Sequence, residues 1–171
     1  MKLLKITAGI FLTLAASRFI PHPPNFTSLI ALSFYVPAIF GLRYVPVVIF
    51  SFVLTDMIIG FHQTLLFTWG SVLLIGYLST LSLFKGNFFL RIIGLFSGSL
   101  IFFLLTNIGV WFTGVYGYTI NSLLNCYILA IPFFTNTVLA TLFFALIIET
   151  INAIFNLDQN YILLQNKNEK S

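Results

Sequence analysis

Six long apolar runs divide this chain, and they leave it few ways to fold. Bounded by single charges, prolines and polar clusters, the runs span about residues 4–20, 26–42, 45–61, 65–84, 89–106 and 126–155. A soluble fold needs polar side chains to cover its surface, yet only 7% of the 171 residues are charged, against roughly 25% in soluble domains. A lipid bilayer solvates apolar side chains, so it removes that requirement. We therefore predict an all-α integral membrane bundle of about six transmembrane helices.

The runs predict a single transmembrane helical domain, residues 1–155, followed by a polar cytoplasmic tail, residues 156–171. Prolines at positions 21, 23 and 24 end the first helix, because proline has no backbone hydrogen to donate. The second run is short for a hydrocarbon core of about 30 Å, so we expect it to be kinked at Pro37, buried by its neighbours, or re-entrant. Gly, Tyr and Asn are frequent between residues 107 and 125, which predicts an ordered loop.

Basic residues sort to one side of the membrane when the six runs are threaded through it. With the N-terminus inside, the outer segments hold only Arg18, and the inner segments hold the other seven basic residues: Lys2, Lys5, Arg43, Lys85, Arg91, Lys167 and Lys170. The positive-inside rule then predicts a multi-pass protein of the bacterial inner membrane with both termini cytoplasmic. The first run could also be read as a signal peptide, but its small residues match a cleavage site poorly, which favours a retained helix.

Several function classes find no support in the residue pattern. Single basic residues between apolar runs do not build a nucleic-acid patch, and without a P-loop the chain shows no ATP site of its own. His22 and His62 are 40 residues apart with no HxH or HxxxH spacing, so satisfaction by water or backbone is favoured over metal binding. No Ser-His-Asp or paired-carboxylate spacing appears. We therefore predict no catalytic residues, no metal and no cofactor.

Polar residues gather in the outer half of the predicted bundle, as the capture of an external solute would require. Asp56 lies within an apolar run, where a carboxylate costs about 2.5–3.5 kcal/mol, and Arg18 is its natural partner. This pair reads equally well as a ligand-binding or gating pair and as a structural pair. Asn107 and Trp111 are spaced to present an amide and an indole to one ligand, although Trp111 also fits an interfacial aromatic belt. The predicted substrate-binding residues are Arg18, Asn25, Asp56, His62, Asn107 and Trp111.

Other residues favour structural roles. Gly94 and Gly98 form a GxxxG pattern, and Gly9, Thr13 and Ser17 form a ridge of small residues; both favour packing within the bundle over docking of another subunit. Glu149 is expected to pair with Arg43 or Arg91. Cys126, the only cysteine, allows no intrachain disulfide and is expected to be a packed residue rather than a ligand of a soft metal.

Several motifs carry a resemblance that covers nearly the whole chain. At SRFIPHPPNFTS, residues 17–28, the sequence resembles a bacterial family of small membrane proteins of uncharacterised function that has an R-x-x-PHPPNFTP-like segment, with Ser28 standing where proline is expected. The further matches are Thr55-Asp56, the FHxxxxFxWGS-like stretch at 61–71, FFLLTNIGVWFTG at 102–114 and CYILAIPFF at 126–134.

That family is similar to the substrate-binding S components of energy-coupling factor (ECF) transporters, which capture a vitamin or related micronutrient from outside the cell. The resemblance implies an ECF S-component-like fold of six helices, a small-molecule solute and the lipid bilayer as partners, and either an ECF coupling subunit with ATPases or action alone. The ridge on the first helix lacks the alanine-rich form expected for docking such a subunit.

Our leading hypothesis is a membrane uptake protein that binds a small, vitamin-like organic nutrient at its outer face. The runner-up is a structural membrane scaffold subunit (MreD-like), which a sealed, apolar outer face would favour. A membrane enzyme acting on lipid is the third reading, and it requires a carboxylate and a histidine in contact within a cleft.

Overall fold

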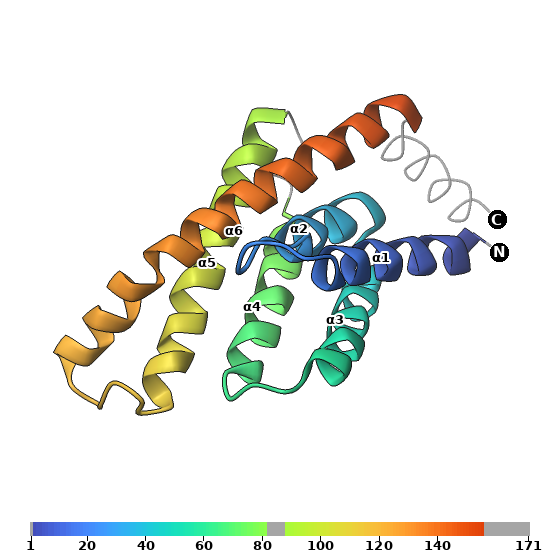
Figure 1. Ribbon diagram of the computed structural model, residues 1–171. Helices are drawn as coiled ribbons and strands as arrows, with labels where there is room; N and C mark the ends of the chain where they lie inside the picture. Colours follow the sequence, from blue (N-terminus) through green and yellow to red (C-terminus); the bar gives the residue numbers. More distant parts are fainter. Residues whose placement is uncertain (1, 82–87, 156–171) are drawn as a thin grey trace.

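The computed structural model describes residues 2–81 and 88–155, and within these ranges the chain is helical, with no strand. Six α-helices and one short 3-10 helix follow one another (Figure 1): α1 (Lys2–Phe19), α2 (Leu29–Phe40), η1 (Leu42–Tyr44), α3 (Val45–Ile59), α4 (Leu65–Leu78), α5 (Phe88–Phe112) and α6 (Ile120–Phe155). The all-α prediction is confirmed. The predicted polar tail, residues 156–171, lies outside the described residues.

Among the described residues, three stretches are long and apolar enough to cross a membrane: Leu42–Ile59, which joins η1 to α3, then α5 and α6. These stretches make the chain a membrane protein. The helices α2 and α4 have 12 and 14 residues and are shorter than a full span. Six crossings, and the orientation that follows from them, stay predictions.

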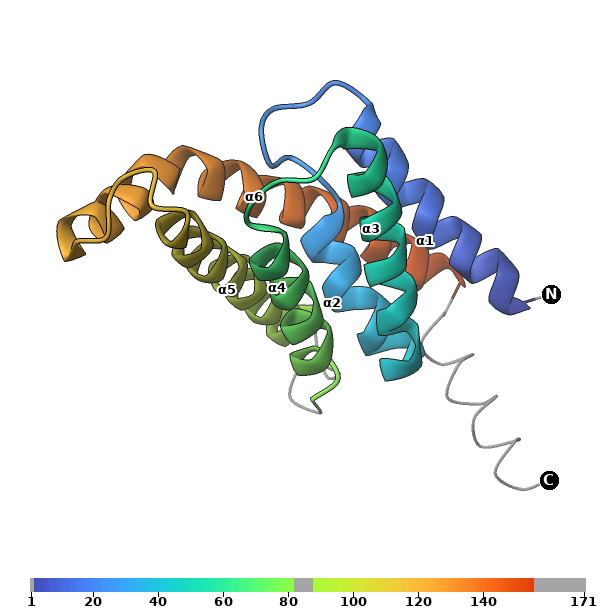
Figure 2. The same ribbon diagram turned by 90° about the horizontal axis from the view of Figure 1, so that it is seen from below.

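Helix α2 occupies the centre of the bundle. All nine residues from Leu29 to Pro37 are buried, and α2 contacts each of the other five α-helices. One of its faces packs with α1, α3 and α4 around Leu32 and Val36, and the other packs with α4, α5 and α6 around Phe34. Figure 2 shows α2 between these groups of helices. At about 1.5 Å per residue, a helix this short does not reach across the core, but protein rather than lipid surrounds it. Of the readings open for the second run, burial by neighbours is the one observed.

Two predicted boundaries are wrong. The second run is expected to reach about residue 42, but α2 ends at Phe40: the N–H of Gly41 donates to the carbonyl oxygen of Pro37 over 2.8 Å, and the φ of Gly41 is +85°. The expected loop at 107–125 is mostly helix, because α5 continues to Phe112 and α6 begins at Ile120. One N–H of the Asn107 amide donates to the carbonyl oxygen of Phe103 within the helix, so a polar residue there does not end α5.

The GxxxG pattern packs inside the bundle. Gly94 and Gly98 are both buried, and a Cβ added at Gly98 would lie 3.3 Å from Cγ2 of Ile75 on α4. This close approach confirms internal packing for that pair. On α1, by contrast, Gly9 and Thr13 are exposed and a Cβ at Gly9 would meet nothing within 4 Å, so this part of the ridge faces away from the bundle.

Candidate functional site

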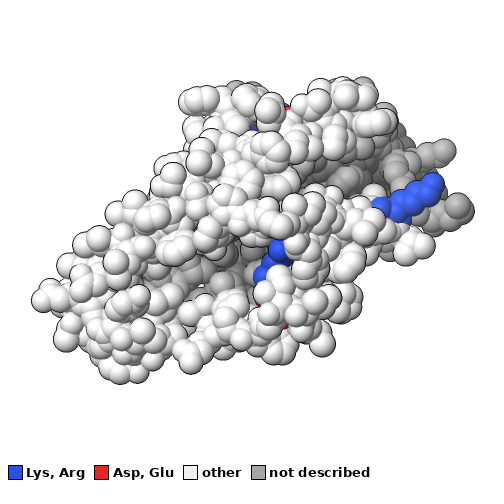
Figure 3. Space-filling model, in the orientation of Figure 1, with Lys and Arg blue, Asp and Glu red and all other residues white. Residues whose placement is uncertain are grey.

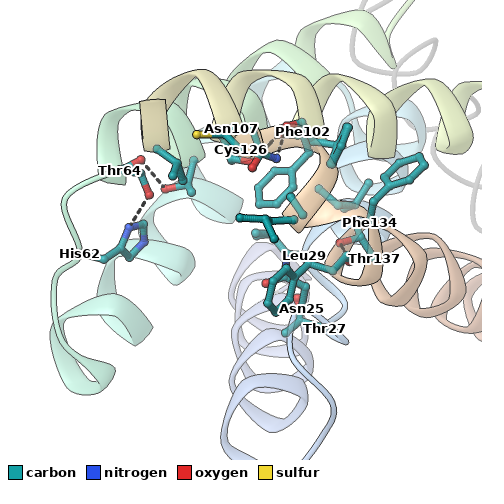
Figure 4. Close-up of a pocket in the computed structure, with 18 of the residues that line it drawn as sticks. Asn25, Thr27, Leu29, His62, Thr64, Phe102, Asn107, Cys126, Phe134 and Thr137 are labelled. Carbon is teal, nitrogen blue, oxygen red and sulfur yellow. Dashed lines mark hydrogen bonds between the residues drawn. The ribbon is translucent and has the colours of Figure 1, made fainter. Parts of the chain in front are cut away.

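A cavity of about 660 Å³ lies between the ends of α3, α4 and α5, the middle of α6, and the segment that joins α1 to α2. Ligand sites for small molecules typically measure about 300–1,000 Å³. In the space-filling view, the visible surface is almost free of charge, and a basic side chain lies in the wall of a deep hollow (Figure 3). Figure 4 shows how the lining residues converge: Asn107 and Cys126 lie together on one side, Phe134 and Thr137 on another, and Asn25 and Thr27 on a third.

Arg18, at the end of α1, brings a positive charge to the cavity wall. Its Nη2 lies 2.7 Å from Oδ1 of Asp56 on α3, and its guanidinium stands over the Phe52 ring at 4.6 Å from the ring centre. Its Nη1 donates to the hydroxyl of Thr55. The predicted Arg18–Asp56 ion pair is therefore present, and it orients the arginine along the wall.

Asp56 supports the site from behind and does not line the cavity. It is fully buried, and its Oδ2 accepts a hydrogen bond of 2.8 Å from Nε1 of Trp69 on α4. Its Oδ1 has the ion pair but no aligned hydrogen-bond donor among the described residues. The role of Asp56 is thus to hold Arg18 and to join α3 to α4.

The segment that joins α1 to α2 is fixed over the cavity by contacts at both ends. The hydroxyls of Ser17 and Ser28 are 2.8 Å apart, and Nδ2 of Asn136 on α6 donates to the carbonyl oxygen of Pro24 over 3.0 Å. The Phe26 ring packs against Phe143 and Phe144 on α6, with ring centres 6.0 and 6.5 Å away. Asn25, with φ at +62°, makes the turn that places it in the lining.

Asn107 and Cys126 contribute a buried patch of the wall from α5 and α6. Asn107 is 8% exposed; it gives one amide hydrogen to the carbonyl oxygen of Phe103 over 2.7 Å and keeps its Oδ1 and its second hydrogen. Cys126 is 2% exposed and has a free thiol. Both are placed to contact an occupant of the cavity.

The two histidines line the mouth of the cavity and are held by neighbouring groups. Nδ1 of His62 is 2.9 Å from the hydroxyl of Thr64, and Nδ1 of His22 is 2.7 Å from the carbonyl oxygen of Pro23. Over the ranges described, no three His, Cys, Asp or Glu side chains come together as a metal site would need. Backbone and side-chain partners therefore account for these histidines.

Trp111 does not line the cavity. Its Nε1 donates to Oγ of Ser122 at 3.2 Å and to the carbonyl oxygen of Thr119 at 3.3 Å, so it fastens the start of α6 to the end of α5. Those contacts hold the 113–119 connection, from which Tyr116 reaches the lining. Of the six predicted site residues, Arg18, Asn25, His62 and Asn107 line one cavity, while Asp56 and Trp111 support it from outside.

A second, partly buried ion pair lies away from the cavity, where α5 begins and α6 nears its end. Nη2 of Arg91 donates to Oε2 of Glu149 over 2.9 Å, and the Nε of Arg91 donates to Oε1. The hydroxyl of Tyr35 on α2 donates to the same Oε1 over 2.6 Å. Of the two partners expected for Glu149, Arg91 is the one observed.

Sequence reasoning missed the five threonines of the lining and the hydrogen bond that Trp69 donates to Asp56. Thr68, Thr106 and Thr137 each interrupt an apolar run, but threonine is tolerated so widely in helices that it gives little signal. Trp69 could have been found, because it lies about as far after the α3–α4 turn as Asp56 lies before it, and such residues stand nearly level in an antiparallel pair.

These features define a helical membrane protein with a partly polar cavity opening at one end of the bundle. Over residues 2–161, the chain matches the family of unknown function DUF6580, and it belongs to that family. No curated protein and no solved structure matches it.

Proposed function

We propose that this protein binds a small organic nutrient at the outer face of the bacterial inner membrane and takes it up in the manner of an ECF S component. The observation that carries the proposal is the cavity of about 660 Å³, with Arg18 and Asn107 in its lining. A cavity of that size, walled by aromatic rings and provided with a few fixed polar groups, suits a small ligand.

The position of the cavity supports capture from outside. It lies at the end of the bundle that holds the α3–α4 and α5–α6 connections, and the positive-inside count assigns that end to the outer face. The other end, with the start of α5 and the later part of α6, carries the Arg91–Glu149 pair. For an uptake protein in its resting state, we expect the binding cavity at the outer end and helices joined to one another at the inner end.

The alternatives have weaker support. A scaffold needs no cavity lined by polar side chains, and such groups are costly to keep inside an apolar bundle. A lipid-modifying enzyme needs a carboxylate within hydrogen-bond reach of a histidine. Asp56 is already engaged by Arg18 and Trp69, and no Asp or Glu is among the described residues that line the cavity.

The test is to identify what the protein retains when it is purified in mild detergent. Mass spectrometry of the extracted small molecules should show one compound enriched at about one per protein in the wild type. Asn107→Leu removes the polar groups while keeping the side-chain size, so this compound should be lost. Cells that express the wild type should accumulate the same compound, labelled, in preference to cells with Asn107→Leu.

Asn121→Leu is the matched control, because Asn121 is exposed on α6 and does not line the cavity. It should retain the compound. Equal thermal unfolding midpoints for the two leucine variants would separate loss of binding from loss of fold. A wild type that retains nothing beyond an unrelated membrane protein purified in parallel would overturn the proposal.

A further inference from the structure

Three of the five threonines that line the cavity, Thr68, Thr106 and Thr137, already donate their hydroxyl hydrogens to backbone carbonyl oxygens. Oγ1 of Thr68 donates to the carbonyl oxygen of Leu65 over 2.8 Å, and Thr106 donates to that of Phe102 over 2.8 Å. Thr137 donates to the carbonyl oxygen of Phe133 over 2.9 Å. A hydroxyl has one hydrogen and two lone pairs, so a threonine bonded in this way can only accept a further hydrogen bond.

The charges of the wall cancel. Arg18 is the only Lys or Arg among the described lining residues, and Asp56 directly behind it neutralises its charge at 2.7 Å. No described lining residue is Asp or Glu, so a cationic ligand would meet Arg18 with no counterion. An anionic ligand would meet an arginine already paired with Asp56, and at Thr68, Thr106 and Thr137 it would meet lone pairs and no hydrogen. A buried unpaired charge is costly in either case.

Much of the remaining wall is aromatic and apolar. Phe102, Phe103 and Phe134 contribute rings from α5 and α6, and the rings of Phe103 and Phe134 are packed with centres 4.8 Å apart. Flat faces of this kind favour stacking or edge contacts with another ring. The apolar surface favours a ligand with an apolar or aromatic ring, and the polar groups favour hydrogen-bonding groups at the edge of that ring.

From these three observations we infer that the ligand is an uncharged ring compound that presents at least two N–H or O–H groups to Thr68, Thr106 and Thr137. The inference rests on the proposed function and adds the chemical class of the ligand. Asn107, with a free Oδ1 and one free N–H, pairs with a donor next to an acceptor on the same edge, as amides and many ring nitrogen compounds offer.

The decisive comparison is between two threonines on α6. Thr137→Val and Thr135→Val each replace a hydroxyl by a methyl group of the same shape, and each removes a bond to the carbonyl oxygen four residues earlier, at 2.9 and 3.1 Å. Thr137 lines the cavity and is buried, whereas Thr135 is exposed and does not line it. The two variants therefore differ in the acceptor that they offer to a ligand.

The probes are uracil against 1,3-dimethyluracil and benzamide against N,N-dimethylbenzamide, with benzoate and protonated benzylamine as charged compounds of similar size. Binding is read as the rise in thermal unfolding midpoint of the detergent-purified protein, since a ligand of the folded state stabilises it. We expect the N–H compounds to bind more tightly than their methylated and charged counterparts. Thr137→Val should weaken binding by about 3- to 10-fold, as the loss of one hydrogen bond implies, and Thr135→Val should leave it unchanged.

Each outcome bears on one proposal. Equal binding of methylated and unmethylated probes, preference for a charged probe, or equal effects of the two valine variants would overturn the inference. So would a co-purified compound that is charged or has fewer than two N–H or O–H groups, although uptake would then still stand. An uncharged co-purified ring compound with two such groups supports the inference even where every probe binds weakly. A protein that neither retains a compound nor responds to any probe contradicts the proposed function, and the inference falls with it.

Discussion

Two arginine–carboxylate ion pairs, one at each end of the bundle, have the same chemistry but serve different purposes. Arg18 and Asp56 join α1 to α3, and Trp69 adds α4 through the carboxylate. Arg91 and Glu149 join α5 to α6, and Tyr35 adds α2. Each of the six α-helices thus contributes one side chain to one of two three-membered clusters. The short helices α2 and α4 are therefore each joined to longer helices.

The clusters differ in how completely their charges are enclosed. The Asp56 side chain is 1% exposed and has one oxygen without an aligned donor, and its arginine borders the cavity. Glu149 is 14% exposed, is bound by Arg91 through both oxygens, and lies outside the cavity lining. The first cluster therefore holds a cation where a ligand can meet it, and the second closes a junction of helices.

Among the substitutions in the two clusters, Arg18→Met should have the largest effect on stability. This change leaves the fully buried Asp56 without its cation, and only Trp69 still donates to it, so unfolding should become easier by about 3–5 kcal/mol. The measurement is an SDS titration of the protein in mixed micelles, followed by circular dichroism. Arg18→Met combined with Asp56→Leu should recover much of the loss, because no charge is then stranded. A double variant as unstable as the single one would contradict this account.

Arg91→Met should cost less, about 2–3 kcal/mol on the same titration. Glu149 is partly exposed and keeps the hydrogen bond from Tyr35, so the stranded charge is better solvated than Asp56 is. Under conditions where both variants stay folded, Arg91→Met should still retain the co-purified compound, whereas Arg18→Met should lose it. Equal loss of the compound in both variants would contradict the assignment of ligand binding to the Arg18 cluster alone.

The sequence predicted the helical membrane class and the Arg18–Asp56 pair for the same reason. Apolar runs and a lone carboxylate within one of them both carry large transfer energies, so few arrangements can satisfy them. The ends of helices were harder to predict. Asn107 looked like the start of a loop, but a side chain that bonds to its own helix removes the cost that would have ended α5.

The site was predicted in part, because the sequence shows polarity but not direction. Arg18, Asn25, His62 and Asn107 do line one cavity, while Trp111 turns to Ser122 and Asp56 lies behind Arg18. Which face of a helix meets the cavity depends on how α2 sets the spacing of its neighbours, and that is a property of packing. The threonine acceptors are invisible in the sequence, since their meaning lies in where each hydroxyl hydrogen points.

The smallest expected effects compare the third member of each cluster. Trp69→Phe deprives Oδ2 of Asp56 of its hydrogen bond in a fully buried setting, which should cost about 2 kcal/mol. Tyr35→Phe removes one bond to Oε1 of Glu149, but the Nε of Arg91 still donates to that oxygen, so the cost should be about 1 kcal/mol. The same SDS titration measures both. If Tyr35→Phe lost more stability than Trp69→Phe, the ranking would be reversed. The carboxylate that depends more on its hydrogen-bond donor would then be Glu149, at the end away from the cavity. Trp69→Phe should in addition weaken retention of the compound, because the carboxylate that orients Arg18 is less firmly held, whereas Tyr35→Phe should leave retention intact.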